Sequence, residues 1–259
     1  MSTHPVRQSF NRAASVYEES ARLQQHVADQ LVQDIHALLP ATFDGRILDA
    51  GCGTGYCLNQ LHRICPQATL LGIDFAETML MQHTRPSHAL AINADLQKLP
   101  LADASVDLYL SSLAWQWCDV HHALNEAYRV LKPGGSLWLT TLVDGTFHEM
   151  AAAFSAAELS PAAHLLTMSQ ESTVLNAFRE TGAPLVATRC QPITTWHADF
   201  NALRHSIRGV GANRLPSAAR ELLDRAARNR LIEAYEALRT PRGLPLTYNV
   251  LTIHALRSA

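Results

Sequence analysis

The sequence has no apolar run near the roughly 18–20 residues that a membrane-spanning helix needs. Its first five residues, Met1 to Pro5, lack the apolar core of a signal peptide. It also lacks internal repeats and low-complexity tracts. We therefore expect a cytoplasmic globular protein with neither a membrane nor a nucleic acid as its partner.

The number and spacing of the cysteines argue against two kinds of site. The five cysteines are odd in number and show no CxxC spacing, so neither a disulfide framework nor a zinc site is indicated. His62 with Cys65, and the pair His121 and His122, come nearest to a ligand pattern, but no second pair has usable spacing. We expect no bound metal.

Length and composition are those of a globular protein. With 259 residues, 47% hydrophobic and 17% charged, the chain can bury the core of one large domain or of one domain with an inserted cap. Charge is unevenly distributed, because residues 1–197 hold 11 Lys or Arg against 18 acids and residues 198–259 hold 10 Arg against 5 acids. The basic C-terminal quarter indicates either an anionic partner or an ordinary solvated helix face.

One stretch, Ile47 to Gly55, carries the strongest local signal. Two apolar residues lead into Asp49, and three glycines then alternate with small residues, as expected for a buried strand that turns into a helix. A tight turn without a ligand would also fit. The dinucleotide fingerprint requires glycine at position 56, where Tyr56 stands, and this disfavours a nicotinamide oxidoreductase.

Two further acids follow apolar segments in the same way as Asp49. Asp74 ends the run that begins at Leu70, and Asp95 follows the segment 89–92. In open parallel sheets the ligand lies beyond the carboxyl ends of the strands, so these acids are expected to meet. The set resembles the class I S-adenosylmethionine-dependent methyltransferases over about 46–142.

The resemblance implies an α/β, Rossmann-like, seven-stranded and mostly parallel sheet with an antiparallel last strand and a helical lid. We divide the single domain into a helical lid segment (1–40), a cofactor-binding core (41–197), a helical lid insertion (198–242) and a final strand (243–259). Strands are expected near 46–50, 69–73, 89–93, 106–111, 136–142, 185–196 and 246–256, the last inserted beside the fifth; helices are expected near 55–64, 76–83, 121–131, 146–157 and 171–181, with two more in 198–242. Lys132 to Gly135 read as the turn before the fifth strand.

The same resemblance assigns roles around S-adenosylmethionine. The backbone of the glycines approaches the methionyl part, Asp49 lies below its ammonium, Asp74 takes the ribose hydroxyls, and Asp95 takes the adenine amino group. The complete predicted cofactor set is Asp49, Gly51, Gly53, Gly55, Asp74, Met79, Asp95, Leu96 and Ser111.

Four segments outside the glycine loop resemble one subgroup, the malonyl-acyl-carrier-protein O-methyltransferases of biotin synthesis. They are Ser9 to Tyr17, Ser111 to Cys118, Thr140 to Thr146 and the lid stretch Leu203 to Asn213. The resemblance implies that Tyr17 closes the site, although core packing would also explain it. In the second segment, Trp115 and Trp117 are expected to make an apolar wall on the acceptor side.

Acyl carrier proteins are small and acidic, so an arginine-rich lid would attract one. Arg204 and Arg208 lie one helical turn apart, and either could bind the free carboxylate of a malonyl group on acyl carrier protein or coenzyme A. A carboxylate is already ionised at neutral pH, so no general base is expected.

Two other functions remain open at this point. A related methyltransferase could act on a quinone ring carbon or on a small carboxylic acid such as aconitate. A protein of another class could bind S-adenosylmethionine as a regulator without turnover.

Overall fold

The computed structural model describes Arg7 and residues 22–82, 85–209 and 223–258, with Arg208 described through its backbone alone. A seven-stranded sheet with the order β3-β2-β1-β4-β5-β7-β6 forms its centre. The strands are β1 (Arg46–Ala50), β2 (Thr69–Asp74), β3 (Leu90–Asn93), β4 (Val106–Ser112), β5 (Leu131–Leu142), β6 (Leu185–His197) and β7 (Leu244–Leu256).

The first five strands pair in parallel, and β7 runs antiparallel between β5 and β6. This is the predicted α/β class, including the antiparallel last strand beside the fifth. Strand order reverses at β1, because β2 lies on one side of it and β4 on the other. The fold therefore offers the expected ligand crevice where β1 and β4 end.

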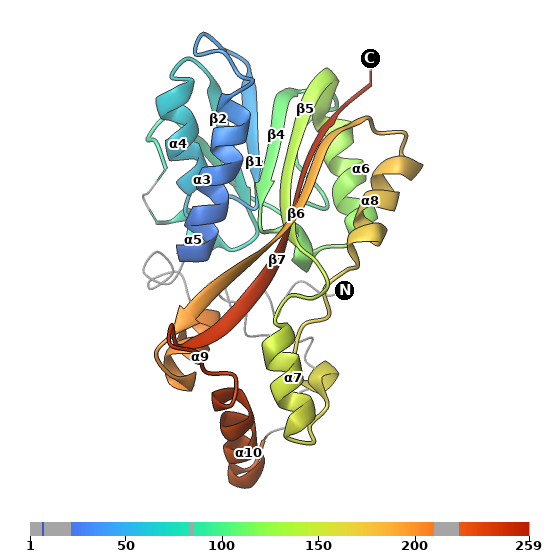
Figure 1. The fold of residues 1–259 in the computed structure, drawn as a ribbon. Coiled ribbons are helices and arrows are strands. Elements are labelled where there is room, and N and C mark those ends of the chain that lie inside the picture. Colours follow the sequence, from blue (N-terminus) through green and yellow to red (C-terminus); the bar gives the residue numbers. More distant parts are fainter. Residues whose placement is uncertain (1–6, 8–21, 83–84, 210–222, 259) are drawn as a thin grey trace.

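Helices cover both faces of the sheet (Figure 1). The first face carries α3 (Arg22–His36), α4 (Tyr56–Ile64) and the short α5 (Glu77–Leu80), while the second carries α6 (Val120–Val130) and α8 (Glu171–Glu180). Apolar side chains from each helical layer form a separate buried cluster against the sheet. Burial on both faces explains why the strands read as apolar runs rather than as alternating patterns.

A third cluster lies beyond the carboxyl ends of the parallel strands. It joins α7 (His148–Ala156), α9 (Phe200–Gly209) and α10 (Arg225–Glu236) to the first turns of α3 and to β7. The long strands β6 and β7 extend past the rest of the sheet to reach these helices (Figure 1). The segment 198–243 enters and leaves this region at neighbouring points, because His197 pairs with Leu244.

One local expectation is wrong. Lys132 to Gly135 were predicted as a turn, but β5 already begins at Leu131, and its pairing with β4 breaks register between Val106 and Leu108. Gly134, with φ +77°, absorbs this irregularity in the strand.

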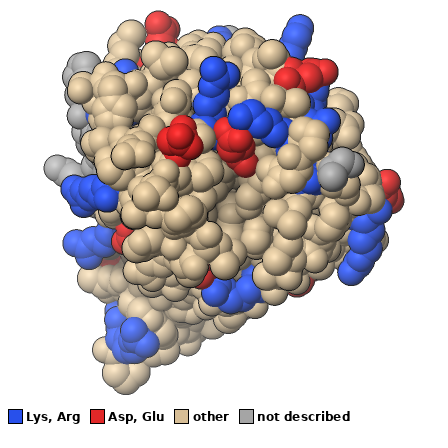
Figure 2. Space-filling model, turned by 90° about the horizontal axis from the view of Figure 1, so that it is seen from above, with Lys and Arg blue, Asp and Glu red and all other residues tan. Residues whose placement is uncertain are grey.

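Among the described residues, no helix is long and apolar enough to cross a membrane. Seen from above, at the end opposite α10, basic and acidic side chains lie next to one another (Figure 2). Ion pairs of the described part include Lys132 with Asp107, whose Nζ and Oδ1 atoms are 2.8 Å apart.

Candidate cofactor and acceptor site

The glycine-rich loop follows β1 and leads into α4. Gly51, Gly53 and Gly55 all have positive φ angles, of 81°, 54° and 95°. A Cβ on Gly51 would lie 2.4 Å from the Cβ of Ala114, whereas a Cβ on Gly53 would meet nothing within 4 Å. Gly51 is therefore required by packing against the protein, and Gly53 leaves open space beside its backbone.

Two adjoining pockets open at this loop. The first encloses about 620 Å³ and the second about 440 Å³, open solvent included, and both are lined by Gly51, Gly53 and Ser112. Of the predicted residues, the first pocket is also lined by Asp74, Met79, Asp95 and Leu96, and the second by Asp49. Seven of the nine predicted cofactor residues therefore come together in one continuous crevice.

Asp49 is the most unusual acid in this crevice. Its side chain is 1% exposed, and neither carboxylate oxygen has a hydrogen-bond partner among the described residues. Burial, together with the nearby charge of Asp74, raises the pKa of Asp49 to about 8. Since a buried carboxylate needs an opposite charge or hydrogen-bond donors, this environment is suited to a cationic ligand group.

Asp74 shapes the loop as well as the pocket. Its two oxygens accept hydrogen bonds from the backbone N–H groups of Gly53, at 2.9 Å, and Ala76, at 2.7 Å. Burial raises the pKa of Asp74 to about 6, although both of these bonds act to lower it. Each oxygen keeps a second acceptor position, so the carboxylate can still receive the hydroxyls of a diol.

The loop after β3 brings Asp95 and Leu96 to the far side of the first pocket. The Asp95 Oδ1 atom accepts the backbone N–H of Gln97 at 2.9 Å, and Gln97 Oε1 accepts the backbone N–H of Asp119. The loop is thereby tied to the start of α6. Sequence reasoning placed the acid here but gave no sign of these ties.

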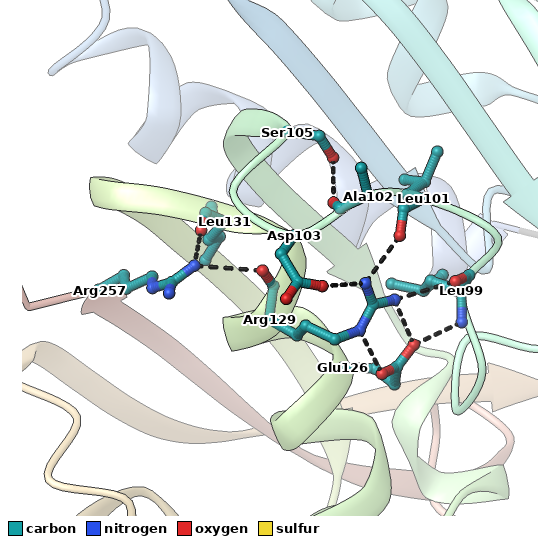
Figure 3. Close-up of polar contacts among 9 residues, drawn as sticks. All are labelled: Leu99, Leu101, Ala102, Asp103, Ser105, Glu126, Arg129, Leu131 and Arg257. Carbon is teal, nitrogen blue, oxygen red and sulfur yellow. Dashed lines mark hydrogen bonds and ion pairs between the residues drawn. The ribbon is translucent and has the colours of Figure 1, made fainter.

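Arg129 on α6 holds the next part of this loop (Figure 3). Its Nη2 atom donates to the Leu99 carbonyl at 2.9 Å and its Nη1 atom to the Leu101 carbonyl at 2.7 Å. Glu126 accepts from the Arg129 Nε atom and from the Leu99 backbone N–H, both at 2.7 Å, and the guanidinium keeps the pKa of Glu126 below its usual range. The Asp95 loop is thus fixed to one helix by bonds that are mostly half-buried.

Apolar residues also line the first pocket, but only one of the two tryptophans expected on the acceptor side is among them. Trp117 lines the first pocket together with Leu113 and Cys118. Trp115 instead lies in the core, 1% exposed, where its ring stacks on Phe178. Burial raises the pKa of the Cys118 thiol strongly, so this thiol stays neutral and is no base at physiological pH.

Two of the predicted cofactor residues line neither pocket. Ser111 is fully buried, and its Oγ donates to the Ala50 carbonyl at 2.6 Å, while the neighbouring Ser112 lines both pockets. Gly55 caps α4, and a Cβ there would lie 2.5 Å from the Cβ of Arg85. In the structure Ser111 supports the end of β1, and Gly55 allows the glycine-rich loop to lead into α4.

Of the predicted substrate residues, the structure describes one side chain, that of Arg204. Arg204 lies half-buried on α9 and lines neither of them. Tyr17 and the side chain of Arg208 fall outside what the structure describes. Among the described residues, no cluster of His, Cys, Asp and Glu could hold a metal ion.

Sequence reasoning missed the part that α3 takes in the site. Gln24, Gln25 and Ala28 line the second pocket opposite the glycine loop. Tyr56 Oη donates to Asp29 Oδ1 at 2.9 Å and so ties α3 to α4. The helical periodicity of α3 was readable from the sequence, but the site that its polar face would meet was not.

This geometry agrees with the similarity of the chain to known protein families and solved structures. A model of the methyltransferase domain family matches residues 48–139. The YcgJ protein from Bacillus subtilis has a similar fold, with TM-score 0.60 and 17% identity over 90% of this chain and 99% of that one. Geranyl diphosphate C-methyltransferase from Streptomyces coelicolor, solved with S-adenosyl-L-homocysteine, has TM-score 0.55 and 16% identity over 93% and 82%. The chain is an S-adenosylmethionine-dependent methyltransferase of class I fold.

Curated relatives define the family more narrowly. Malonyl-[acyl-carrier protein] O-methyltransferases from Dechloromonas aromatica and Herminiimonas arsenicoxydans are 37% and 38% identical to this chain, over 96% and 98% of it and 93% and 96% of their own lengths. The biotin biosynthesis bifunctional protein BioHC of Cellvibrio japonicus is 33% identical over 95% of this chain and 48% of its own length. The chain belongs to the malonyl-[acyl-carrier protein] O-methyltransferase family.

Proposed function

We propose that this chain transfers a methyl group from S-adenosylmethionine to the free carboxylate of a malonyl group carried on acyl carrier protein, as a step of biotin synthesis. The observation that carries the proposal is the extent of the family similarity. It covers 96–98% of the chain, well beyond the generic methyltransferase segment 48–139. It therefore includes the lid segments, where substrate selection is expected.

The residues of the crevice fit the cofactor chemically. The partnerless Asp49 carboxylate suits the ammonium of the methionyl part, Asp74 suits the ribose diol, and Asp95 suits the adenine amino group. Met79 and Leu96 supply apolar surface beside them. Bound S-adenosylmethionine supplies an electrophilic methyl group.

The chain's own task in the transfer is to align the acceptor and to exclude water. Free carboxyl groups titrate near pH 4, so the malonyl carboxylate is already a nucleophile at neutral pH and needs no base. The neutral Cys118 thiol and the ring of Trp117 give it an apolar surround. In this proposal Arg204 or Arg208 orients the carboxylate, and Tyr17 closes the site.

The basic face of α10 supports a protein carrier. Arg225 and Arg228 are exposed, lie three residues apart on one helix, and form no ion pair with a described residue. An acidic carrier protein would be drawn to α10, whereas coenzyme A would gain less from this surface.

The test offers the purified protein S-adenosylmethionine with malonyl-carrier protein, malonyl-coenzyme A or acetyl-carrier protein, and reads the mass of the acyl group. We expect a gain of one methyl group on the malonyl species and none on acetyl. A malonyl thioester whose carboxylate is already esterified is the matched control. The proposal fails if neither malonyl thioester is methylated while the protein binds S-adenosylhomocysteine.

A further inference from the structure

The second pocket contains more hydrogen-bond acceptors than its predicted residues explain. Besides the two oxygens of Asp49, the Gln24 Oε1 atom is buried there without a hydrogen-bond partner among the described residues. An acceptor that is left buried and unpaired is unfavourable, because it has lost its hydrogen bonds to water. Three such oxygens around one pocket are best explained by a ligand group that carries several donors and a positive charge. A primary ammonium, with three N–H donors, is such a group.

Gln24 is held in place by the packing of α3. Leu23 and Val27, on either side of it in sequence, are buried in the cluster beneath the lid helices. Further along the helix, Asp29 accepts hydrogen bonds from Tyr56 at 2.9 Å and from Gln60 at 3.3 Å. These contacts fix α3 against α4, so the Gln24 carboxamide is presented to the pocket from a rigid element.

The start of α4 also lines the pocket. Thr54, Tyr56 and Cys57 are among its lining residues, and α4 begins at Tyr56 with no acidic side chain in its first turn. The first N–H groups of a helix have no partner within the helix and favour an anion. The pocket thus combines unpaired acceptors with the start of a helix, a combination that suits the ammonium and the carboxylate of an α-amino acid.

We propose that Gln24 is a cofactor-binding residue that accepts a hydrogen bond from the ammonium of the methionyl part, together with Asp49. The inference rests on the cofactor site within the proposed function and not on the identity of the acceptor. It assigns to α3 a direct part in selecting ligands that carry a free amino group.

The test is calorimetric binding of three ligands without turnover. S-adenosylhomocysteine has both ammonium and carboxylate, S-adenosyl-3-thiopropylamine has only the ammonium, and 5′-methylthioadenosine has neither. We expect Gln24→Leu to weaken the first two about 10- to 100-fold and to change the third less than about twofold. Gln33→Leu is the matched control, because Gln33 lies exposed on the same helix.

Thermal unfolding of the ligand-free variants checks that they fold, and Gln24→Met repeats the test with a side chain of similar shape. Gln24→Glu keeps an acceptor and should retain binding of S-adenosyl-3-thiopropylamine. The inference is overturned if Gln24→Leu and Gln24→Met bind S-adenosylhomocysteine like the wild type, or if all three ligands weaken equally. If the wild type itself binds no S-adenosylhomocysteine, the assignment of this crevice to the cofactor is wrong instead.

Discussion

The buried carboxyl of Asp49 should make cofactor affinity depend on pH near neutrality. In the ligand-free protein its pKa is raised to about 8 by burial and by Asp74, so the group is mostly protonated at pH 7. An ammonium beside it favours the ionised form and lowers the pKa. Binding therefore releases a proton, and affinity rises with pH up to about 8.

The size of the effect follows from the ionised fraction. With a pKa of about 8, roughly a tenth of the Asp49 carboxyl is ionised at pH 7 and about a hundredth at pH 6. The Kd for S-adenosylhomocysteine should thus rise about tenfold when the pH falls from 7 to 6, which corresponds to about 1.4 kcal/mol of binding free energy. Isothermal titration in buffers of different ionisation enthalpy measures both the affinity and the released proton.

Two controls isolate the group responsible. Asp49→Asn should bind S-adenosylhomocysteine more weakly at pH 8 and should lose the tenfold slope between pH 7 and pH 6. The ligand 5′-methylthioadenosine, which has no ammonium, should show no such slope with either protein. A wild-type affinity that stays constant between pH 6 and pH 8 would refute the reasoning.

The same residue gives a prediction for stability. Because its folded pKa lies above the ordinary value near 4, the folded state holds a proton that the unfolded state has lost between about pH 4 and pH 8. Stability of the ligand-free protein therefore falls with rising pH in that window. Asp49→Asn should unfold at a higher temperature than the wild type at pH 8, and the difference should vanish near pH 4.

Two further predictions concern arginines. Arg129→Met should lower the free energy of unfolding by about 1–3 kcal/mol, since it removes the partner of the half-buried Leu99 and Leu101 carbonyl bonds. It should also raise the KM for S-adenosylmethionine by loosening the Asp95 loop. Urea unfolding and kinetics measure both effects, with exposed Arg179→Met as control, and an unchanged KM would contradict the second. Replacing Arg225 and Arg228 together by Glu should raise the KM for malonyl-carrier protein severalfold and leave that for malonyl-coenzyme A unchanged. An equal effect on both substrates would show that α10 is not the docking surface for the carrier protein.

The cofactor crevice was largely readable from the sequence. Asp49, Asp74 and Asp95 each follow an apolar run, and parallel strands end at one edge of a sheet, so their meeting follows from topology. The finer choice between Ser111 and Ser112 was not readable. Adjacent strand residues face opposite sides, but both faces of β4 are covered, so no polar alternation marks the side that meets the pocket.

Long-range packing explains what else was missed. The periodicity of α3 predicts its buried stripe, but the position of Gln24 at the pocket depends on how α3 packs against α4, where Asp29 bonds to Tyr56. Trp115 is similar, because its core position depends on Phe178, far along the chain. The predicted binding roles of the lid residues Arg204, Arg208 and Tyr17 stay predictions.

The segment that connects β6 to β7 is suited to exchange by protein engineering. Because His197 and Leu244 are paired neighbours in the sheet, the segment 198–243 begins and ends at neighbouring points. A corresponding segment from a relative could be grafted there without altering the register of any strand. Its apolar residues would have to match α7, against which Leu231 and Tyr235 now pack. We expect such a graft to alter the acceptor preference proposed for the lid insertion, while the cofactor crevice stays as it is.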